Sequence, residues 1–185
     1  MLKFLRSRAG AAAVLAFVVI FSTLFGSHRS LAAEAGKITA QNENVKKDLE
    51  TRWAVGSNLY TVAGRYLDTG KGAIALEELS TTLGLARASE TKLKEDAKAV
   101  MGTLYQDQLL DALDGVLAEL EHVELSAQDA QYVSGFRAQL ESISYTLAHD
   151  PYNEGAAEFN ATTLGSFPAS LLGPLTGVRE LPVYQ

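Results

Sequence analysis

Residues 126–168 read SAQDAQYVSGFRAQLESISYTLAHDPYNEGAAEFNATTLGSFP, and this stretch decides the fold. In its first part apolar side chains recur at intervals of three and four residues, which predicts one buried stripe along a helix. Ser126 followed by Asp129 predicts where this helix starts, with the serine as N-cap and the acid as its reciprocating partner. The stripe consists of Val133, Phe136, Leu140, Ile143 and Leu147.

Pro151 interrupts this helical pattern. Because proline lacks a backbone N–H and clashes with the preceding turn, we expect a kink or break near His149 and Asp150. Beyond it an aromatic–amide pair recurs after seven residues, an interval that keeps both rings on one helical face. The pairs are Tyr152-Asn153 and Phe159-Asn160, and Phe167-Pro168 follows them.

The two asparagines of these pairs have two interpretations. The amides of Asn153 and Asn160 can bond neighbouring helices or cap the break after Pro151, which would fix the register of the packing. Alternatively, they can form a polar patch for a partner. We favour the first interpretation, because buried amides commonly specify register.

Composition and charge exclude several classes of protein. The chain has 185 residues, 47% of them hydrophobic, which is enough for one substantial core. It has no cysteine, so disulfides and thiolate metal sites are excluded. Four basic residues and no acidic one precede Ser30, which leaves 12 basic against 22 acidic residues in the rest. The acidic body argues against nucleic-acid binding, whereas the basic end suits a membrane.

An uncharged run from Ala9 to Gly26 follows Lys3, Arg6 and Arg8. As a helix rising about 1.5 Å per residue it would be about 27 Å long, close to the hydrocarbon thickness of a bilayer. We expect an uncleaved transmembrane anchor; the alternative is a secretory signal cleaved after Ser30-Leu31-Ala32. The positive-inside rule predicts a cytoplasmic N-terminus and an acidic body outside the cell membrane.

The remaining segments also have helical spacing, and none alternates with a period of two. We expect helices at residues 30–67, 73–101 and 104–123, with a glycine-containing turn at residues 68–72. With the helix after Ser126 they predict an all-α fold, an antiparallel four-helix bundle with an N-terminal transmembrane helix. The predicted organisation is a basic flank and anchor at residues 1–29, the bundle at residues 30–168 and an irregular tail at residues 169–185.

No arrangement of residues in the sequence predicts catalysis. Glu119 and His122 have the Glu-x-x-His spacing of di-iron bundles, but the chain lacks the second pair. It also lacks a glycine-rich phosphate loop and a nucleophile elbow. We therefore predict no catalytic, cofactor-binding or metal-binding residue. The larger aromatic side chains of the body are expected to fill the core: Trp53, Tyr60, Tyr66, Tyr105, Tyr132 and Tyr145.

The C-terminal pattern of Tyr-Asn pairs at a heptad and a following Phe-Pro resembles the closing motif of the LemA family. The single apolar segment and helical body are similar to that family's layout over essentially the whole chain. LemA-like proteins also carry a twin-basic pair and a Leu-Ile-Pro-Asn-Leu-Val block in the first long helix. Here Arg52 and Asn58-Leu59 fit that block, whereas Thr51 and Ser57 replace a basic residue and the proline, as in a divergent member.

The resemblance implies a membrane-anchored bundle with no established enzymatic activity and an envelope-associated or scaffold-like role. We expect a non-enzymatic interaction module with a protein partner, in the cell membrane and without a cofactor. The alternative is an extracytoplasmic sensor or ligand-binding bundle that works with a partner protein. The oligomeric state is not predicted by the sequence. The residues that match the family motifs are Arg52, Asn58, Leu59, Tyr152, Asn153, Phe159, Asn160, Phe167 and Pro168.

Overall fold

The computed structural model describes residues 8–93, 99–167, 169–170 and 178–184. Within these ranges every regular element is a helix, so the predicted all-α class is confirmed for the described chain. The elements are α2 (Arg8–Thr39), α3 (Glu43–Ala63), α4 (Gly70–Leu93), α5 (Ala99–Leu120), α6 (Ala127–Ala148), α7 (Pro151–Glu158) and the π-helical turn η1 (Phe159–Leu164).

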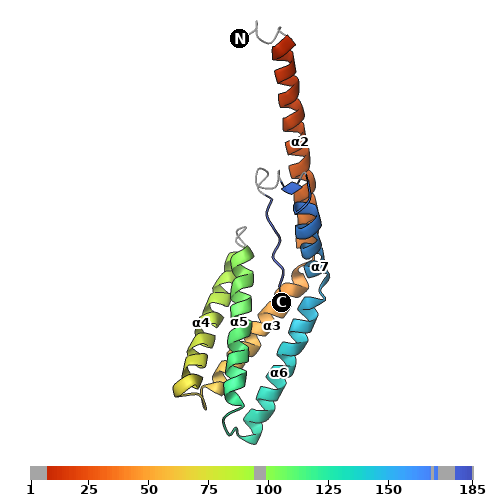
Figure 1. The fold of residues 1–185 in the computed structure, drawn as a ribbon. Helices are drawn as coiled ribbons and strands as arrows, with labels where there is room; N and C mark the ends of the chain where they lie inside the picture. Colours follow the sequence, from red (N-terminus) through yellow and green to blue (C-terminus); the bar gives the residue numbers. More distant parts are fainter. Residues whose placement is uncertain (1–7, 94–98, 168, 171–177, 185) are drawn as a thin grey trace.

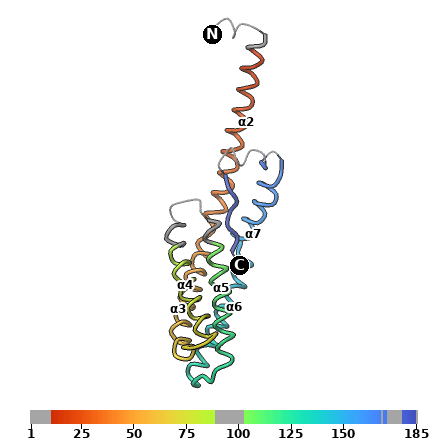
Figure 2. The backbone as a smooth tube through the Cα atoms, turned by 60° about the vertical axis from the view of Figure 1, so that its left-hand side comes forward, coloured from red at the N-terminus to blue at the C-terminus, as the bar shows by residue number. Residues whose placement is uncertain are grey.

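Four of the helices, α3 to α6, lie side by side with successive helices running in opposite directions (Figure 1). The helix α3 contacts α4, α5 and α6, and α4 packs along α5. The helix α2 extends away from one end of this group, and α7 runs beside the base of α2 (Figures 1 and 2). The chain therefore has a packed body and a long projecting N-terminal helix.

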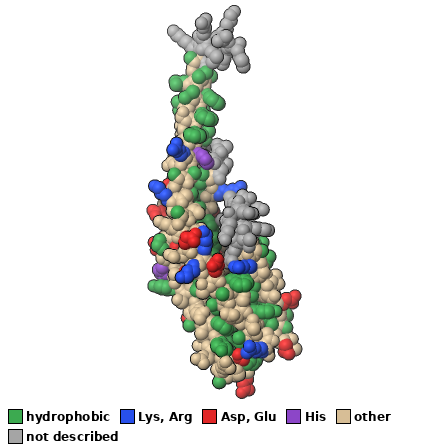
Figure 3. Space-filling model, turned by 180° about the vertical axis from the view of Figure 1, so that it is seen from behind, with side chains coloured by type: hydrophobic (Ala, Val, Ile, Leu, Met, Phe, Trp, Pro, Cys, Tyr) green, Lys and Arg blue, Asp and Glu red, His purple; other side chains and the backbone are tan. Residues whose placement is uncertain are grey.

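The projecting part of α2 is apolar and exposed. Among the described helices, α2 is long and apolar enough to cross a membrane, from Ala11 to Thr39, with a mean hydropathy of 1.9 in its most apolar part. Figure 3 shows apolar side chains around the far part of this helix, with charged side chains appearing towards the body. A signal sequence near an N-terminus meets the same criterion, so helix length and apolarity agree with both interpretations of residues 9–26.

The predicted helix over residues 30–67 is wrong in its boundaries. The helix α2 continues without a break to Thr39, and a tight turn at residues 40–42 separates it from α3. In this turn Gln41 N donates to Ile38 O and Asn42 N to Thr39 O, which are contacts three residues apart. Gln41 and Asn42 are polar, so a helix that continued straight through them would have no apolar side chain there to pack on the body.

The predicted turn at residues 68–72 is correct in part, because the chain turns between Ala63 and Gly70 and residues 70–72 already belong to α4. Gly70 has a φ of +60°, the left-handed conformation that glycine adopts without a steric penalty. The next two predicted helices have different ends, because α4 covers Gly70–Leu93 and α5 covers Ala99–Leu120. The predicted continuation of the second helix through residues 94–98 lies outside the described residues.

Two hydrophobic cores hold the body together, and α6 contributes to both. The distal core lies between α3, α4, α5 and α6 and includes Val133 and Leu140 of the predicted stripe. The second, here called the junction core, lies where α3, α6, α7 and the C-terminal segment meet, and it includes Ile143 and Leu147. Phe136 is half-buried against the distal core, so the predicted α6 stripe is confirmed.

Several predicted core residues are not buried. Tyr60, Tyr132 and Tyr145 are exposed, so the expectation that the aromatic side chains fill the core is wrong for these three. Tyr132 directly precedes a buried stripe position and Tyr145 lies two residues after another, and such positions face away from the stripe. On α5, Leu109 is in the core and its neighbour Leu110 is half-buried. Trp53, Tyr66 and Tyr105 are half-buried.

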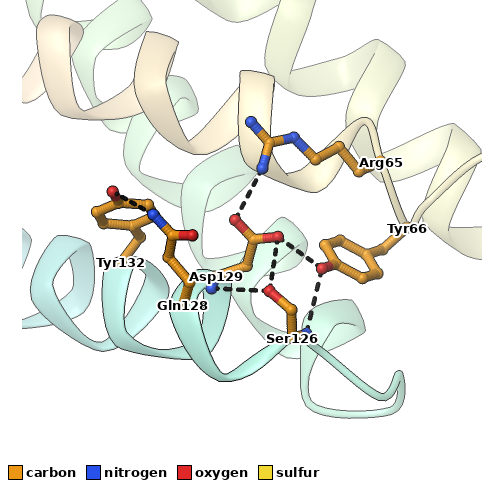
Figure 4. Close-up of polar contacts among 6 residues, drawn as sticks. All are labelled: Arg65, Tyr66, Ser126, Gln128, Asp129 and Tyr132. Atoms are coloured by element: carbon orange, nitrogen blue, oxygen red, sulfur yellow. Dashed lines mark hydrogen bonds and ion pairs between the residues drawn. The ribbon is translucent and has the colours of Figure 1, made fainter.

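Polar contacts set the start of α6 (Figure 4). Ser126 Oγ accepts from Asp129 N at 3.1 Å, which confirms the predicted N-cap. The predicted reciprocal bond between the Asp129 carboxylate and the Ser126 amide is not formed. The Ser126 amide donates instead to the Tyr66 hydroxyl at 3.2 Å. The Asp129 carboxylate accepts from Tyr66 Oη at 2.6 Å and from Arg65 Nη1 at 2.8 Å. These contacts join the end of α3 to the start of α6.

Replacing Leu140 by alanine should lower the free energy of unfolding by about 2–5 kcal/mol, because Leu140 is 4% exposed in the distal core. The neighbouring Gln139 is exposed, and Gln139→Ala should change this free energy by no more than about 0.5 kcal/mol. Urea unfolding of both variants measures the difference. Equal effects of the two substitutions would contradict the placement of the core.

The Asp129 contacts predict a loss of stability in acid. The hydrogen bond from Tyr66 lowers the pKa of Asp129, Ser126 and Arg65 lower it further, and burial opposes them. The carboxylate therefore stabilises the fold above the unfolded pKa of about 4, and this contribution is lost as the pH falls through the lowered folded pKa. Unfolding midpoints of wild type and Asp129→Asn should differ at neutral pH and converge in acid. Glu124→Gln, at an exposed position, serves as the control. A lower unfolding midpoint of Asp129→Asn that persists in acid would contradict the contribution of the charge.

Candidate functional site

The predicted break at Pro151 separates α6 from α7. The helix α6 ends at Ala148, and Asp150 is the N-cap of α7, with Pro151 in its first turn. Asp150 Oδ1 accepts from Tyr152 N at 2.8 Å, which satisfies one of the free amides at the start of the helix. Proline is well accommodated here because its missing N–H needs no partner in the first turn. The break thus starts a new helix at a fixed point.

The aromatic–amide pairs lie along α7 and η1. Tyr152 and Phe159 are each 1% exposed, so both rings are on the buried face, as the heptad interval predicted. Tyr152 belongs to the junction core. Asn153 is also buried and Asn160 is half-buried, and both amides are directed at the C-terminal residues 178–184, here called the tail segment.

Each asparagine binds the main chain of one tail residue through both atoms of its amide. Asn153 Oδ1 accepts from Tyr184 N at 2.9 Å, and its Nδ2 donates to Tyr184 O at 2.7 Å and to Leu147 O at the end of α6. Asn160 Oδ1 accepts from Leu181 N and its Nδ2 donates to Leu181 O, both at 2.8 Å. We call Asn153 and Asn160 the asparagine clasp.

The spacing of the clasp matches that of the residues it binds. Seven residues of helix separate the two asparagines, a rise of about 10.5 Å at about 1.5 Å per residue. Three residues separate Leu181 from Tyr184, which span about 10 Å in an extended chain at about 3.3 Å per residue. Because Asn153 pairs with Tyr184 and Asn160 with Leu181, the tail segment runs antiparallel to α7.

Side chains of the tail segment add apolar contacts to these hydrogen bonds. The Tyr184 ring lies 6.3 Å from the Tyr152 ring, and Leu181 packs against the junction core. Burial raises the pKa of Tyr184 to about 12, and burial with the neighbouring Tyr184 raises that of Tyr152 as well. Both phenols are therefore neutral at physiological pH. Pro182 restricts Leu181 to extended conformations, which prepares the segment for the clasp.

The preferred interpretation of the asparagine pair is correct in part. Asn153 does bond a neighbouring helix, through Leu147 O, but the clasp chiefly binds the tail segment. The amide groups are thus engaged within the chain and do not form an open polar patch. In the tail segment, Leu181 and Tyr184 pack on the junction core.

The residues that matched the family's first-helix block lie on α3. Leu59 is in the distal core and Asn58 is exposed. Arg52 is fully buried, and its Nη2 lies 3.5 Å from Ser144 Oγ on α6. Burial lowers the pKa of Arg52, and the nearby carboxylates oppose this, first among them Asp107 on α5. Arg52 is therefore a buried cation held between three helices, away from solvent.

The last two motif residues are not part of the clasp. Phe167 follows η1 and is 82% exposed, and Pro168 lies outside the described residues. The structure thus brings together Tyr152, Asn153 and Asn160 with two tail residues that the sequence did not single out, Leu181 and Tyr184. The available signals were the Leu-Pro step and the lone aromatic of residues 178–184.

The groups of the clasp region are hydrogen-bonding and apolar groups. They are two primary amides, two neutral phenols and main-chain atoms, which hold an extended segment by hydrogen bonds and apolar contact. No group of three or more acidic or histidine side chains in the described ranges could hold a metal ion. Comparison with protein-family models, with curated proteins and with solved structures found no match for this chain.

Removing one amide of the clasp should release one tail residue at a time. In Asn160→Ala the Leu181 amide loses its acceptor, so its hydrogen exchange should accelerate by about fivefold, for roughly 1 kcal/mol lost. The Tyr184 amide should stay protected by Asn153. Asn58→Ala, at an exposed position of α3, is the matched control and should change neither amide. Rapid exchange of both amides in the wild-type chain would show that the tail segment is not held.

Proposed function

We propose that this chain is a membrane-anchored, non-enzymatic interaction or scaffold module of the cell envelope and a divergent member of the LemA family. In this proposal α2 is an uncleaved anchor, and α3 to α6 form the antiparallel four-helix bundle that meets the protein partner. Residues 1–29 contain the flank and anchor, residues 30–168 the bundle, and residues 169–185 the tail. The family assignment is supported by the motif residues alone.

One observation carries the proposal: the apolar helix does not end where the body begins. Leu31 of α2 is 6% exposed, and Ile38 packs against the junction core. Cleavage after Ala32 would remove Leu31 from the folded protein and cut α2 in the middle of its packed part. A removable signal is not expected to be buried in the mature protein, so the low exposure of Leu31 supports a retained anchor.

Contacts between α2 and α7 support a fixed attachment of the anchor. Ile38 Cγ2 lies 3.5 Å from the position of a β-carbon on Gly155, so the two helices are closely packed there. Further along, Thr163 Oγ1 lies 3.3 Å from Glu34 Oε1. The clasp in turn holds the tail segment against α7. The junction core therefore ties the anchor, the body and the tail segment into one unit, as a scaffold at a membrane requires.

The charges at the two ends of the apolar run support the orientation. Lys3, Arg6 and Arg8 precede the run, and the side chains of all three lie outside those that the structure describes. The body carries the acidic excess of the chain. By the positive-inside rule the N-terminus stays in the cytoplasm and the body is extracytoplasmic.

Intact-mass measurement of the membrane-extracted protein tests retention of the anchor. The measured mass should correspond to a chain that includes residues 9–26, and the protein should remain in the membrane pellet after alkaline washing. A mature chain that begins at Ala33 would contradict retention. Orientation has a separate test, in which protease added outside the cytoplasmic membrane should digest the body. Changing Lys3, Arg6 and Arg8 to glutamate should protect the body, because the cationic excess sets the direction.

A further inference from the structure

Phe167 is the most exposed of the large apolar side chains in the described ranges. It is 82% exposed, whereas the apolar side chains on the projecting part of α2 are between 44% and 68% exposed. A single exposed phenylalanine is common at a protein surface and has no meaning by itself. Phe167 is of interest because of its position relative to the apolar run of α2.

Two contacts define how the chain before Phe167 lies along α2. Gly155 is opposite Ile38, and Thr163 bonds Glu34, so the chain from α7 through η1 advances towards the N-terminal, apolar part of α2. Figure 1 shows the same arrangement, with α7 beside the base of α2 and rising towards its exposed part. The side chain of Phe167 therefore belongs to the end of the body that is nearest the apolar run.

The distance from Phe167 to the apolar run can be estimated from this register. Phe167 is four residues beyond Thr163 and past the end of η1 at Leu164, so the Cα atoms of the two residues are at most about 14 Å apart. The uncharged run ends at Gly26, eight residues or about 12 Å along α2 from Glu34. A headgroup layer is about 5–7 Å thick in each leaflet. Phe167 is therefore within reach of the headgroup layer when residues 9–26 fill the hydrocarbon.

The polar residues of α2 at this level agree with that placement. His28 and Arg29 are exposed and follow directly after the apolar run. Basic side chains at the end of a spanning helix extend into the headgroup layer, and aromatic side chains are enriched at the same depth. Phe167 comes from a different part of the chain from His28 and Arg29, and the headgroup layer is within reach of all three.

We infer that the side chain of Phe167 inserts into the headgroup layer of the bilayer that α2 crosses, as a second contact with a lipid surface. The inference rests on the proposed anchoring by α2. A lipid surface is the occupant because the exposed ring is close to the apolar run of α2, whose residues 11–26 include none that is buried. Two contacts with the membrane limit rotation and tilt of the body, whereas one helix leaves both free.

The absence of cysteine makes this placement directly measurable. A single cysteine is introduced in the full chain by Phe167→Cys, labelled with an environment-sensitive fluorophore and reconstituted in phosphatidylcholine vesicles. Vesicles carrying a nitroxide on the headgroup should quench the label at position 167. The same label at Ser134→Cys, an exposed position on α6 in the distal half of the body, should not be quenched. Because Phe167 is exposed, its replacement removes no core contact.

A third label at Phe25→Cys on α2 separates this inference from the anchor proposal. Quenching at position 25 by a deep nitroxide lipid, with position 167 as unquenched as position 134, would overturn the inference and leave the anchor intact. No quenching at position 25 would overturn both. Quenching at positions 25 and 167 that persists in high salt supports an apolar insertion, because attraction between charges and headgroups is screened. Quenching at position 167 that is lost in high salt would overturn it.

Discussion

The buried amide of Asn153 is the interaction on which the organisation of this protein depends. It is 4% exposed and makes three hydrogen bonds, one to the end of α6 and two to the tail segment. A buried amide without partners costs about 1–3 kcal/mol, so both segments must be in place for this side chain to be buried at all. Asn160 adds a second bidentate contact one heptad away. Because these contacts are directional, they select one register for the tail segment, which apolar packing alone does not.

The clasp acts at the junction core, where the projecting helix meets the body. Side chains of α3, α6 and α7, the base of α2 and the tail segment contribute to this core, and these segments are widely separated in the chain. The distal core is built differently, mostly from apolar side chains of four adjacent helices. Arg52 links α3 to α6, with Ser144 as its neighbour, and Ser144 directly follows Ile143 of the junction core. The clasp and the contact of Arg52 with Ser144 thus both join segments that are far apart in sequence.

The continuity of α2 with the junction core fixes how the projecting helix is attached to the body. An anchor joined by a flexible linker leaves the body free to turn, whereas α2 is continuous from its apolar part into the junction core. The turn at residues 40–42 redirects the chain into α3, and α7 packs against the last turns of α2. The body consequently has one defined position relative to α2, and the end of the body next to the projecting part of α2 is formed by α7 and the base of α2.

The sequence by itself determined the features that depend on neighbours in the chain. The α6 stripe, the Ser126 cap, the break at Pro151 and the apolar character of α2 follow from spacings of three or four residues or from the covalent geometry of proline. Only the tertiary structure decided which groups meet across long separations. The sequence indicates that the amide of Asn153 needs hydrogen-bond partners. It does not indicate which ones, because Tyr184 is 31 residues away and meets Asn153 only through the path of the folded chain. The burial of Leu31 and the exposure of Tyr132 and Tyr145 depend likewise on how each helix is turned against its neighbours, because a rotation by one residue brings a different face of the helix against the body.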